Sequence, residues 1–339
     1  MPIEPYVWMK LAGNFPPGLV TNVPDSLLKE DFTPDAANMN INADGYMQSG
    51  TIPSGTARTV QQYTIGANVY DYHYERLWRF SGSQVIFNAP IYTAVYLPQG
   101  TGTLDLNESS GSILAMLPIG ETGLIFLRSG GSNIITQAND KRAYFFTQDY
   151  AQEVSISTAT HAVELDGLVY YVNTSGLFSV DIQGNVKELS QAVYGSITPA
   201  ALTADYLRKQ IIIGTALVYD VQKEKFFKYA TGSFYYYSRQ LRSSDNSTIT
   251  VNKIGFEYDK SSTTAGEIQF KTQTETRGWS KTFKCSVLDR EEMKEHAEID
   301  IDPAIGLTWQ LYITQLPSNI KLKNIWVRVK GFTPESRES

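Results

Sequence analysis

The sequence has little of several residue types on which function often depends. Its 339 residues include one cysteine and three histidines, and no run of 18 apolar residues occurs. A single cysteine permits no internal disulfide, as expected for a protein folded in a reducing cytoplasm. The missing apolar run predicts no transmembrane helix, and residues 1–18 lack the basic start and apolar stretch of a secretory signal. We therefore expect synthesis in a cytoplasm and no membrane insertion.

Positive charge is also in short supply. The chain has 29 Lys and Arg against 35 Asp and Glu, a net charge of −6. Tight DNA binding needs clustered cations that neutralise phosphates, so this balance argues against specific nucleic-acid binding. The apolar fraction of 42% and the aromatic fraction of 12% suffice for a packed core, which excludes a mainly disordered chain.

The common catalytic and cofactor motifs are missing. The sequence has no GxxxxGK[ST], GxGxxG, HExxH, CxxC or GxSxG. The histidines, His73, His161 and His296, have no second ligand two or four residues away, so a metal site would need them to converge in space. We expect no cofactor and no metal, and we expect Cys285 to serve packing.

What the sequence does have is a succession of short strands from about Val60 to Gln240. Runs rich in Val, Ile, Phe and Tyr alternate with turns of Gly, Asn, Asp and Ser. Four strand-turn-strand segments begin 46, 44 and 42 residues apart, a spacing typical of propeller blades. They start at Arg76, Thr122, Asp166 and Arg208. The predicted fold class is all-β and propeller-like. Within and after this region, residues 190–194 and 199–207 have the composition for a short helical turn, and residues 287–296 for either a helical turn or an exposed charged loop.

Both flanks differ from this middle region. Residues 1–60 hold half of the 14 prolines and predict an extended N-terminal arm, with room for one short helix at 26–31. After the blades of residues 61–243, the polar SSDNST segment marks a boundary. Residues 244–332 alternate apolar and polar residues more cleanly, so we expect a C-terminal β module or closing blades with one face open to solvent or a partner. Residues 333–339 are expected to be a disordered tail.

Two groups of residues are candidates for function. Glycosidases on propellers use two carboxylates at a set separation. Most of the candidates here lie beside glycine or at strand ends, where aspartate serves turns, and the sialidase boxes of Ser-x-Asp-x-Gly-x-Thr-Trp are absent. The carboxylates are Asp71, Asp166, Asp181, Asp205, Asp220 and Glu257. The aromatic run of Phe234, Tyr235, Tyr236 and Tyr237 is a candidate partner surface for sugars or proteins, unless these rings simply fill half-buried blade faces.

Residues 31–57 and 216–230 resemble a known family. Many phage tail proteins introduce their first blade with an Asn-apolar-x-x-x-Gly phrase followed by Arg-x-Gly; Asn38, Gly45 and Gly50 match it here, but the arginine is missing. The segment ALVYDVQKEKFFKYA is similar to their closing strands, with Tyr219 and Asp220 in the shared places. The phrases that follow residue 270 resemble their C-terminal module. The chain thus resembles the tail nozzle or hub proteins of short-tailed bacteriophages, also called packaged-DNA stabilisation proteins.

The resemblance implies a structural subunit of the virion tail, made in the host cytoplasm. Six copies would form a homo-oligomeric ring below the adaptor and portal, with tail fibres or a needle as further partners. DNA would pass through the lumen without specific binding, and the acidic balance would help by repelling phosphates. No catalytic residue is implied, so we expect no enzyme. A receptor- or glycan-binding propeller and a propeller glycoside hydrolase remain alternatives.

Overall fold

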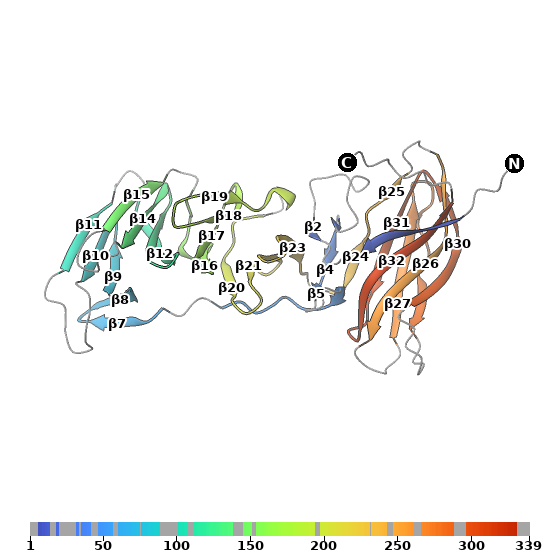
Figure 1. Cartoon of the computed structure of the whole chain (residues 1–339), viewed down its shortest axis with the longest axis horizontal. Coiled ribbons are helices and arrows are strands. Elements are labelled where there is room, and N and C mark those ends of the chain that lie inside the picture. Colours follow the sequence, from blue (N-terminus) through green and yellow to red (C-terminus); the bar gives the residue numbers. More distant parts are fainter. Residues whose placement is uncertain are drawn as a thin grey trace. The chain divides into compact units, whose positions relative to one another are not determined.

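A computed structural model describes most of the chain, and contacts divide it into two compact units. One comprises residues 54–214, here called the blade unit, and the other comprises residues 1–53 and 215–339, here called the sandwich unit. The described residues are 6–13, 18–19, 32–33, 35–41, 47–56, 60–74, 76–88, 101–106, 111–137, 145–150, 154–193, 197–230, 232–242, 247–260, 266–287 and 296–330. Every regular element in these ranges is a strand or a short 3₁₀ turn (Figure 1), which confirms the all-β prediction.

Antiparallel meanders that follow one another along the chain make up the blade unit. The first sheet contains β7 (Gln62–Ile65), β8 (Asn68–His73), β9 (Arg76–Ser81), β10 (Gln84–Asn88) and β11 (Thr101–Asp105). The second contains β12 (Ile113–Ile119), β13 (Gly123–Arg128), β14 (Gly131–Gln137) and β15 (Phe145–Tyr150). The third contains β16 (Ala162–Leu165), β17 (Leu168–Asn173), β18 (Gly176–Val180) and β19 (Val186–Glu188). The hairpin of β20 (Leu202–Asp205) and β21 (Gln210–Ile213) follows.

This succession agrees with the repeat read from the sequence. The predicted segment starts at Arg76, Thr122, Asp166 and Arg208 lie at, or up to two residues before, β9, β13, β17 and β21. The later three of these strands are the second members of their meanders. Sheets of about four strands that recur at this spacing are propeller-like.

The turn between β16 and β17 illustrates how local sequence sets these meanders. Leu165 pairs with Leu168, so only Asp166 and Gly167 form the loop. Both have positive φ, 54° and 78°. A two-residue hairpin of this type needs left-handed backbone at both positions, and Asp-Gly is among the sequences that adopt it at least cost.

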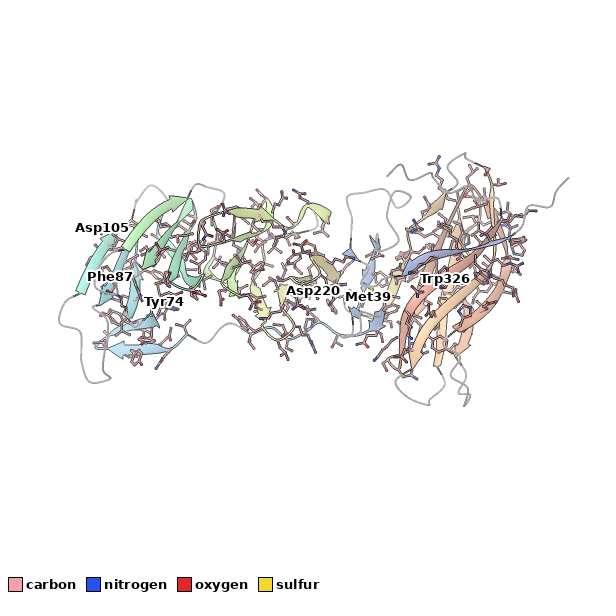
Figure 2. The ribbon with its side chains drawn as sticks, in the orientation of Figure 1. Met39, Tyr74, Phe87, Asp105, Asp220 and Trp326 are labelled. Carbon is pink, nitrogen blue, oxygen red and sulfur yellow. The ribbon has the colours of Figure 1, made fainter. Side chains whose placement is uncertain are left out.

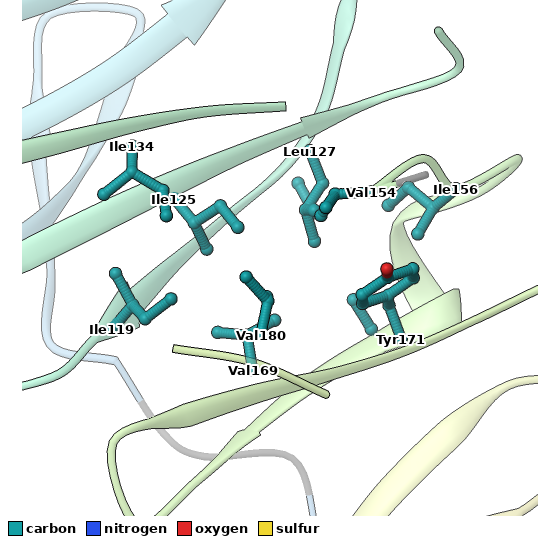
Figure 3. Packing of buried hydrophobic residues seen from close by; sticks show 11 residues of the cluster. Ile119, Ile125, Leu127, Ile134, Val154, Ile156, Val169, Tyr171 and Val180 are labelled. Atoms are coloured by element: carbon teal, nitrogen blue, oxygen red, sulfur yellow. The ribbon is translucent and has the colours of Figure 1, made fainter. Parts of the chain in front are cut away.

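The second blade sheet has both faces covered. On one face, Phe126 and Leu124 pack with Trp78 and Val85 of the first sheet. On the other, Ile125 and Leu127 pack with apolar side chains of the third sheet (Figure 3). All six residues of β13 are therefore buried. This explains why GLIFLR reads as a continuous apolar run rather than an alternating strand.

Two sheets form the sandwich unit. The first sheet contains β30 (His296–Gly306), β26 (Ile249–Lys260), β32 (Ile320–Lys330), β6 (Met47–Ser49), β5 (Met39–Ile41) and β1 (Val7–Gly13). The second contains β28 (Gly278–Trp279), β27 (Gly266–Thr274), β31 (Thr308–Gln315), β24 (Tyr235–Tyr237), β4 (Ala36–Ala37), β25 (Leu241–Arg242) and β29 (Phe283–Val287). Phe256 of β26 and Phe270 of β27 meet between the sheets, with ring centroids 5.4 Å apart. The inner faces therefore share one core, as in other β-sandwiches.

Clean alternation marks β27 and β32, as predicted, but not β31, in which Trp309, Gln310 and Leu311 are all buried. In β27, Phe270 and Thr272 are buried, whereas Lys271 and Gln273 are half-buried. The strand β32 alternates in the same way: Trp326, labelled in Figure 2, is half-buried between the buried Ile325 and Val327. One face of each sheet is covered and the other is open within the described part of the unit.

Four described strands of the N-terminal arm, β1, β4, β5 and β6, are built into these two sheets. The strand β1 pairs with β32, β6 pairs with β32 at one position, and β4 pairs with β24. The sandwich unit also includes a parallel pair, β2 (Gly18–Leu19) and β3 (Phe32–Thr33), and a hairpin, β22 (Leu217–Asp220) and β23 (Lys225–Lys228). The arm and the C-terminal module thus belong to one unit.

Among the described residues, helical structure is limited to η3 (Ala159–His161) and η4 (Gln191–Val193). The turn at η4 lies where the sequence predicted one. The expectation of a helical turn at 199–207 is wrong for Leu202–Asp205, because these residues pair with β21 as a strand. The expected helix at 26–31, most of the 287–296 segment and the tail at 333–339 lie outside the described residues.

Candidate functional site: an aromatic face on the sandwich unit

Alternation along β24 decides which residues of the aromatic run face outward. Phe234 and Tyr236 are 6% and 0% exposed, whereas Tyr235 and Tyr237 are half-buried. Tyr236 lies opposite Ile313, an inner-face residue of β31. Two of the four residues predicted as a partner surface therefore belong to the interior, and only Tyr235 and Tyr237 face outward.

Neighbouring strands add two aromatic rings to this outward pair. Tyr312 of β31 lies opposite Tyr237, and the two rings stack with centroids 4.3 Å apart and an interplanar angle of 1°. Trp279 of β28 approaches both, with centroids 5.6 Å from Tyr237 and 5.4 Å from Tyr312. We call Tyr235, Tyr237, Trp279 and Tyr312 the aromatic face. Trp279 is 38% exposed, so it is the member that offers most ring surface to solvent.

Trp279 and Tyr312 were missed from the sequence because they lie far from residues 234–237 along the chain. The alternation of LTWQLYIT indicates which face Tyr312 takes, but not which strand lies beside it. The register of β24 against β31 alone brings Tyr237 and Tyr312 together. That register is a tertiary property that no local pattern specifies.

The hydroxyls of Tyr235 and Tyr237 stay protonated well above neutral pH. Burial is the main cause that raises the pKa of Tyr237 to about 12, and the neighbouring Tyr312 is the second. Burial also raises the pKa of Tyr235 above its ordinary value, against the opposing effect of a hydrogen bond from Lys228. At neutral pH these hydroxyls are therefore neutral groups that can donate and accept hydrogen bonds.

A charged pair lies beside Tyr235. The Lys228 ammonium donates to Asp35 Oδ1 at 3.0 Å and to the Tyr235 hydroxyl at 3.2 Å. Burial alone would lower the pKa of Lys228, but these hydrogen bonds and the Asp35 charge raise it overall. The Tyr235 hydroxyl in turn donates to Asp35, 3.2 Å away. The cluster fixes the Tyr235 ring and adds no net charge to the face.

The strand next to β31 contributes polar groups and one further cation. Lys271 of β27 lies directly opposite Tyr312, and Gln273 lies opposite Trp279. Both face outward, because their neighbours Phe270, Thr272 and Thr274 are buried. The aromatic face therefore combines exposed ring area with an amide and an ammonium group.

The family-like motif positions meet at another place in the sandwich unit. Asn38 has φ 55°, and its backbone N–H donates to the Lys228 carbonyl. Its side-chain amide donates to the Gly232 carbonyl at 2.9 Å and accepts from the Ala230 N–H at 3.1 Å. Its own carbonyl accepts from the Gly50 N–H. Asn38 thereby ties the segment around residues 38–50 to the end of β23.

The other two motif positions lie on the strand that pairs with β23. Tyr219 packs on Phe226 with ring centroids 4.9 Å apart. Asp220, labelled in Figure 2, is 1% exposed and accepts from the Lys223 backbone and ammonium nitrogens, each at 3.0 Å. These roles are structural. Gly45 lies outside the described residues.

The candidate carboxylates are held by turns and by cross-strand partners. Asp181 accepts from the Gln183 and Asn185 N–H groups, and Asp205 accepts from those of Leu207 and Arg208. The remaining partners are Gln62 for Asp71, Lys209 for Asp166 and Asn324 for Glu257. With Asp220 also at a turn, the prediction that aspartates serve turns is confirmed for Asp181, Asp205 and Asp220, but Asp71 and Glu257 lie within strands.

The histidines and the cysteine do not form a metal site in the described ranges, where no group of three or more His, Cys, Asp or Glu is placed to hold an ion. His161 Nδ1 lies 3.0 Å from Ser157 Oγ, and His296 Nε2 lies 3.1 Å from Glu298 Oε1. Cys285 is buried, as predicted, and burial raises the pKa of its thiol to about 11. No helix among the described residues is long and apolar enough to cross a membrane.

The blade unit has an open pocket of about 540 Å³ between neighbouring turns. Its lining consists of Ser129, Gly130, Ser155, Asn173, Thr174, Ser175 and Phe178. None of these side chains is charged, and Asn173 Oδ1 is used by the Ser175 N–H in its own turn. The pocket has a single aromatic ring, that of Phe178, and lacks the cation of the aromatic face.

No protein family and no curated protein matches the chain in sequence. The chain has weak similarity to a number of solved structures, three of which follow. A glycoside hydrolase family 43 arabinoxylan arabinofuranohydrolase from Bacillus subtilis, in complex with cellotetraose, is 10% identical, with TM-score 0.25 over 93% of this chain and 70% of that one. An exo-beta-1,3-galactanase from Phanerochaete chrysosporium, with galactose, is 11% identical, with TM-score 0.18 over 80% and 68%. A Bacillus thuringiensis Cry1Da tryptic core variant is 12% identical, with TM-score 0.22 over 84% and 53%. Similarity at this level decides neither fold nor function, which depend here on the strand order and contacts of the chain itself.

Proposed function

We propose that this chain is a non-catalytic β protein that binds carbohydrate through the aromatic face. The observation that carries the proposal is the stacked Tyr237 and Tyr312 pair, with Trp279 38% exposed beside it on the outward side of a sheet. A sugar ring presents C–H groups on its faces, and an aromatic ring has a negative face that attracts them. Tyrosine and tryptophan also offer large contact areas at a low entropy cost.

The placement of the candidate acids supports a non-catalytic role. A glycosidase needs one carboxylic acid and one carboxylate free to face the scissile bond. Asp181 and Asp205 instead accept backbone hydrogen bonds in their own turns, and Asp220 is buried against Lys223. If any of these aspartates turned toward a substrate, it would lose the hydrogen bonds that stabilise its own turn.

Native electrophoresis through gels that contain neutral or acidic polysaccharides tests the proposal. We expect the full chain to be retarded by at least one polysaccharide, and Tyr312→Ala to remove the retardation. Trp8→Ala is the matched control, because Trp8 lies on β1 of the other sheet and is 39% exposed. Equal loss of retardation in both variants, or no retardation by any polysaccharide, would rule the proposal out.

The second candidate is a subunit of a bacteriophage tail nozzle or hub. It is favoured by the way in which the family-like positions come together: Asn38 bonds to Gly50 and to Lys228 of β23, and β23 pairs with the strand of Tyr219 and Asp220. In this role the chain would form a homo-oligomeric ring below the portal and adaptor, with DNA passing through its lumen. A carbohydrate-binding face is compatible with such a subunit.

Electron microscopy of a particle that carries this chain tests the second candidate directly. We expect several copies in a ring at the portal end. The chain could be monomeric in isolation and form the ring only on the adaptor, so its mass in solution is not decisive. Isolated copies at fibre tips, or no copies in the particle, would exclude the nozzle role and leave carbohydrate binding to be judged on its own test.

A further inference from the structure

A cation without an ion-pair partner distinguishes the aromatic face from a purely neutral sugar platform. The lysines on or beside it are Lys228, Lys271, Lys281 and Lys284. Lys228 pairs with Asp35 at 3.0 Å, and Lys284 pairs with Glu267 at 3.1 Å. Lys281 is exposed two positions after Trp279. Lys271 lies on β27, between β29 and β31, and has no carboxylate partner among the described residues.

The position of Lys271 is fixed relative to the rings. It lies opposite Tyr312 in the β27–β31 register, and directly opposed residues have Cβ atoms roughly 4.5–5.5 Å apart. Tyr312 in turn stacks on Tyr237 and lies 5.4 Å from Trp279. The long lysine side chain can therefore reach a group bound over these rings.

The three rings form an angled surface. The ring plane of Trp279 is inclined at 58° to Tyr237 and at 59° to Tyr312. A ligand that covers the exposed Trp279 ring would thus turn one edge toward the tyrosine pair and Lys271. A sugar ring has this form, because its faces are apolar and its edge carries the polar substituents. Gln273, opposite Trp279, adds an amide that can bond to hydroxyl groups.

We infer that the aromatic face binds an acidic carbohydrate, with a sugar ring against Trp279 and its carboxylate or phosphate group at Lys271. This inference rests on the proposed carbohydrate-binding function and specifies its ligand class. Charge complementarity carries it: Lys228 and Lys284 are neutralised by carboxylates, whereas Lys271 beside Tyr312 keeps its positive charge for an anionic substituent. The exposed Arg277 and Lys281 on either side of Trp279 add to that charge. Because the whole chain has a net charge of −6, non-specific attraction to a polyanion is disfavoured.

Affinity electrophoresis of the full chain, with polygalacturonate as the acidic probe and dextran as the neutral one, tests the inference. We expect retardation by polygalacturonate that weakens as salt is added, and weaker retardation by dextran. Trp279→Ala should reduce affinity for polygalacturonate at least about tenfold, which corresponds to ~1.4 kcal/mol. Lys271→Gln should remove the preference for polygalacturonate over dextran. Lys284→Gln and Trp8→Ala are the matched controls and should behave like the wild type.

Each other outcome has a defined meaning. If Lys271→Gln keeps the preference for the acidic probe, the inference fails while carbohydrate binding stands. If Trp279→Ala is retarded by polygalacturonate as strongly as the wild type, the binding is not at this face and the inference fails. If neither probe retards the chain, or only the neutral one does, the inference also fails; binding to any other polysaccharide then decides the proposed function. Self-association that Trp279→Ala abolishes, with no binding to either probe, would show that a second copy occupies the face.

Discussion

The two units of this protein bury their strands in different ways. In the blade unit, β13 lies in a sheet that is covered on both faces, and all six of its residues are buried. In the sandwich unit, β27 is covered on one face only, and every second residue faces outward. The difference shows where a ligand surface is available. A strand buried on both sides can only hold the fold together, whereas a strand with one open face can present side chains such as Lys271 in a fixed row.

The largest expected effects are on the free energy of unfolding, and alanine substitutions at adjacent positions of β13 and of β27 test the difference in burial. In the blade unit, Ile125→Ala and Phe126→Ala should each lower the free energy of unfolding by about 2–5 kcal/mol, because each leaves a cavity in a different core. In the sandwich unit, Phe270→Ala should cost about 3–5 kcal/mol, whereas Lys271→Ala should cost less than about 0.5 kcal/mol.

Urea unfolding followed by far-UV circular dichroism measures these four free energies. The comparison between the units holds if the two blade variants are alike and the two sandwich variants differ. A mild effect of either Ile125→Ala or Phe126→Ala would mean that one face of the second blade sheet is not packed in solution. A severe effect of Lys271→Ala would mean that its side chain is structural, which would also count against the ligand role proposed for it.

The two units also differ in how far apart in sequence their stabilising contacts lie. The blade meanders pair neighbouring strands, but Asn38 ties β5 to residues 228–232 of the sandwich unit. Asn38→Ala loses these side-chain bonds and places alanine at φ 55°, so we expect a loss of about 2–4 kcal/mol. Asn38→Gly keeps the backbone conformation and should cost about 1–2 kcal/mol.

Hydrogen exchange of the intact chain shows where the loss falls. In Asn38→Ala, amide protection should fall in β4, β5, β23 and β24, and should be unchanged in β12–β18 of the blade unit. Uniform loss of protection in both units would contradict the separation of the two, and equal stability of the alanine and glycine variants would contradict the role of the positive φ.

The contrast between local and distant contacts also explains what could be predicted from the sequence. The blades were predictable because each meander is local: turn residues such as Asp166 and Gly167 set the hairpin, and the strand spacing repeats. The pairing of β1 with β32 was not, because it joins residues more than 300 positions apart and no local pattern encodes its register. The same reason hid half of the aromatic face, since Trp279 and Tyr312 reach Tyr237 only through the order of β24, β31 and β27. The aspartate turns were predictable because their hydrogen bonds lie within four residues.

A smaller effect on the free energy of unfolding is expected where Glu275 joins two turns of the sandwich unit. The Glu275 carboxylate accepts from the Leu307 and Thr308 N–H groups and from the Thr308 hydroxyl. Burial alone would raise the pKa of Glu275, but the bonds from Leu307 and Thr308 lower it below its ordinary value. Glu275→Gln should therefore reduce the free energy of unfolding by about 1 kcal/mol at pH 7.

The pH dependence of this stability difference shows whether the charge of Glu275 is its cause. A carboxyl with a lowered pKa stabilises the fold above its unfolded pKa, which is near 4.5, and loses this contribution as the pH falls through the lower folded value. The difference between Glu275→Gln and the wild type should therefore shrink below about pH 4. Urea midpoints measured from pH 3 to pH 7 check this. A difference that stays constant over this range would show that the charge of Glu275 plays no part.

The smallest effects on stability are expected from one tyrosine in each unit, the buried Tyr170 and the half-buried Tyr237, and they appear only at alkaline pH. Burial and the nearby Asp166 raise the pKa of Tyr170 to about 12, and burial and Tyr312 do the same for Tyr237. Since these folded values exceed the ordinary value of 10.0, the stabilising contribution is complete below pH 10 and is lost as the pH rises toward 12. Absorbance titration at alkaline pH should show one fewer late-ionising tyrosine in Tyr170→Phe and in Tyr237→Phe, and unfolding in urea should abolish the delay.

Because Tyr237 belongs to the open face, a polysaccharide bound there should delay its ionisation further and leave the ionisation of Tyr170 unchanged. If bound polysaccharide delayed the ionisation of both tyrosines further, or of neither, this result would contradict binding at the aromatic face.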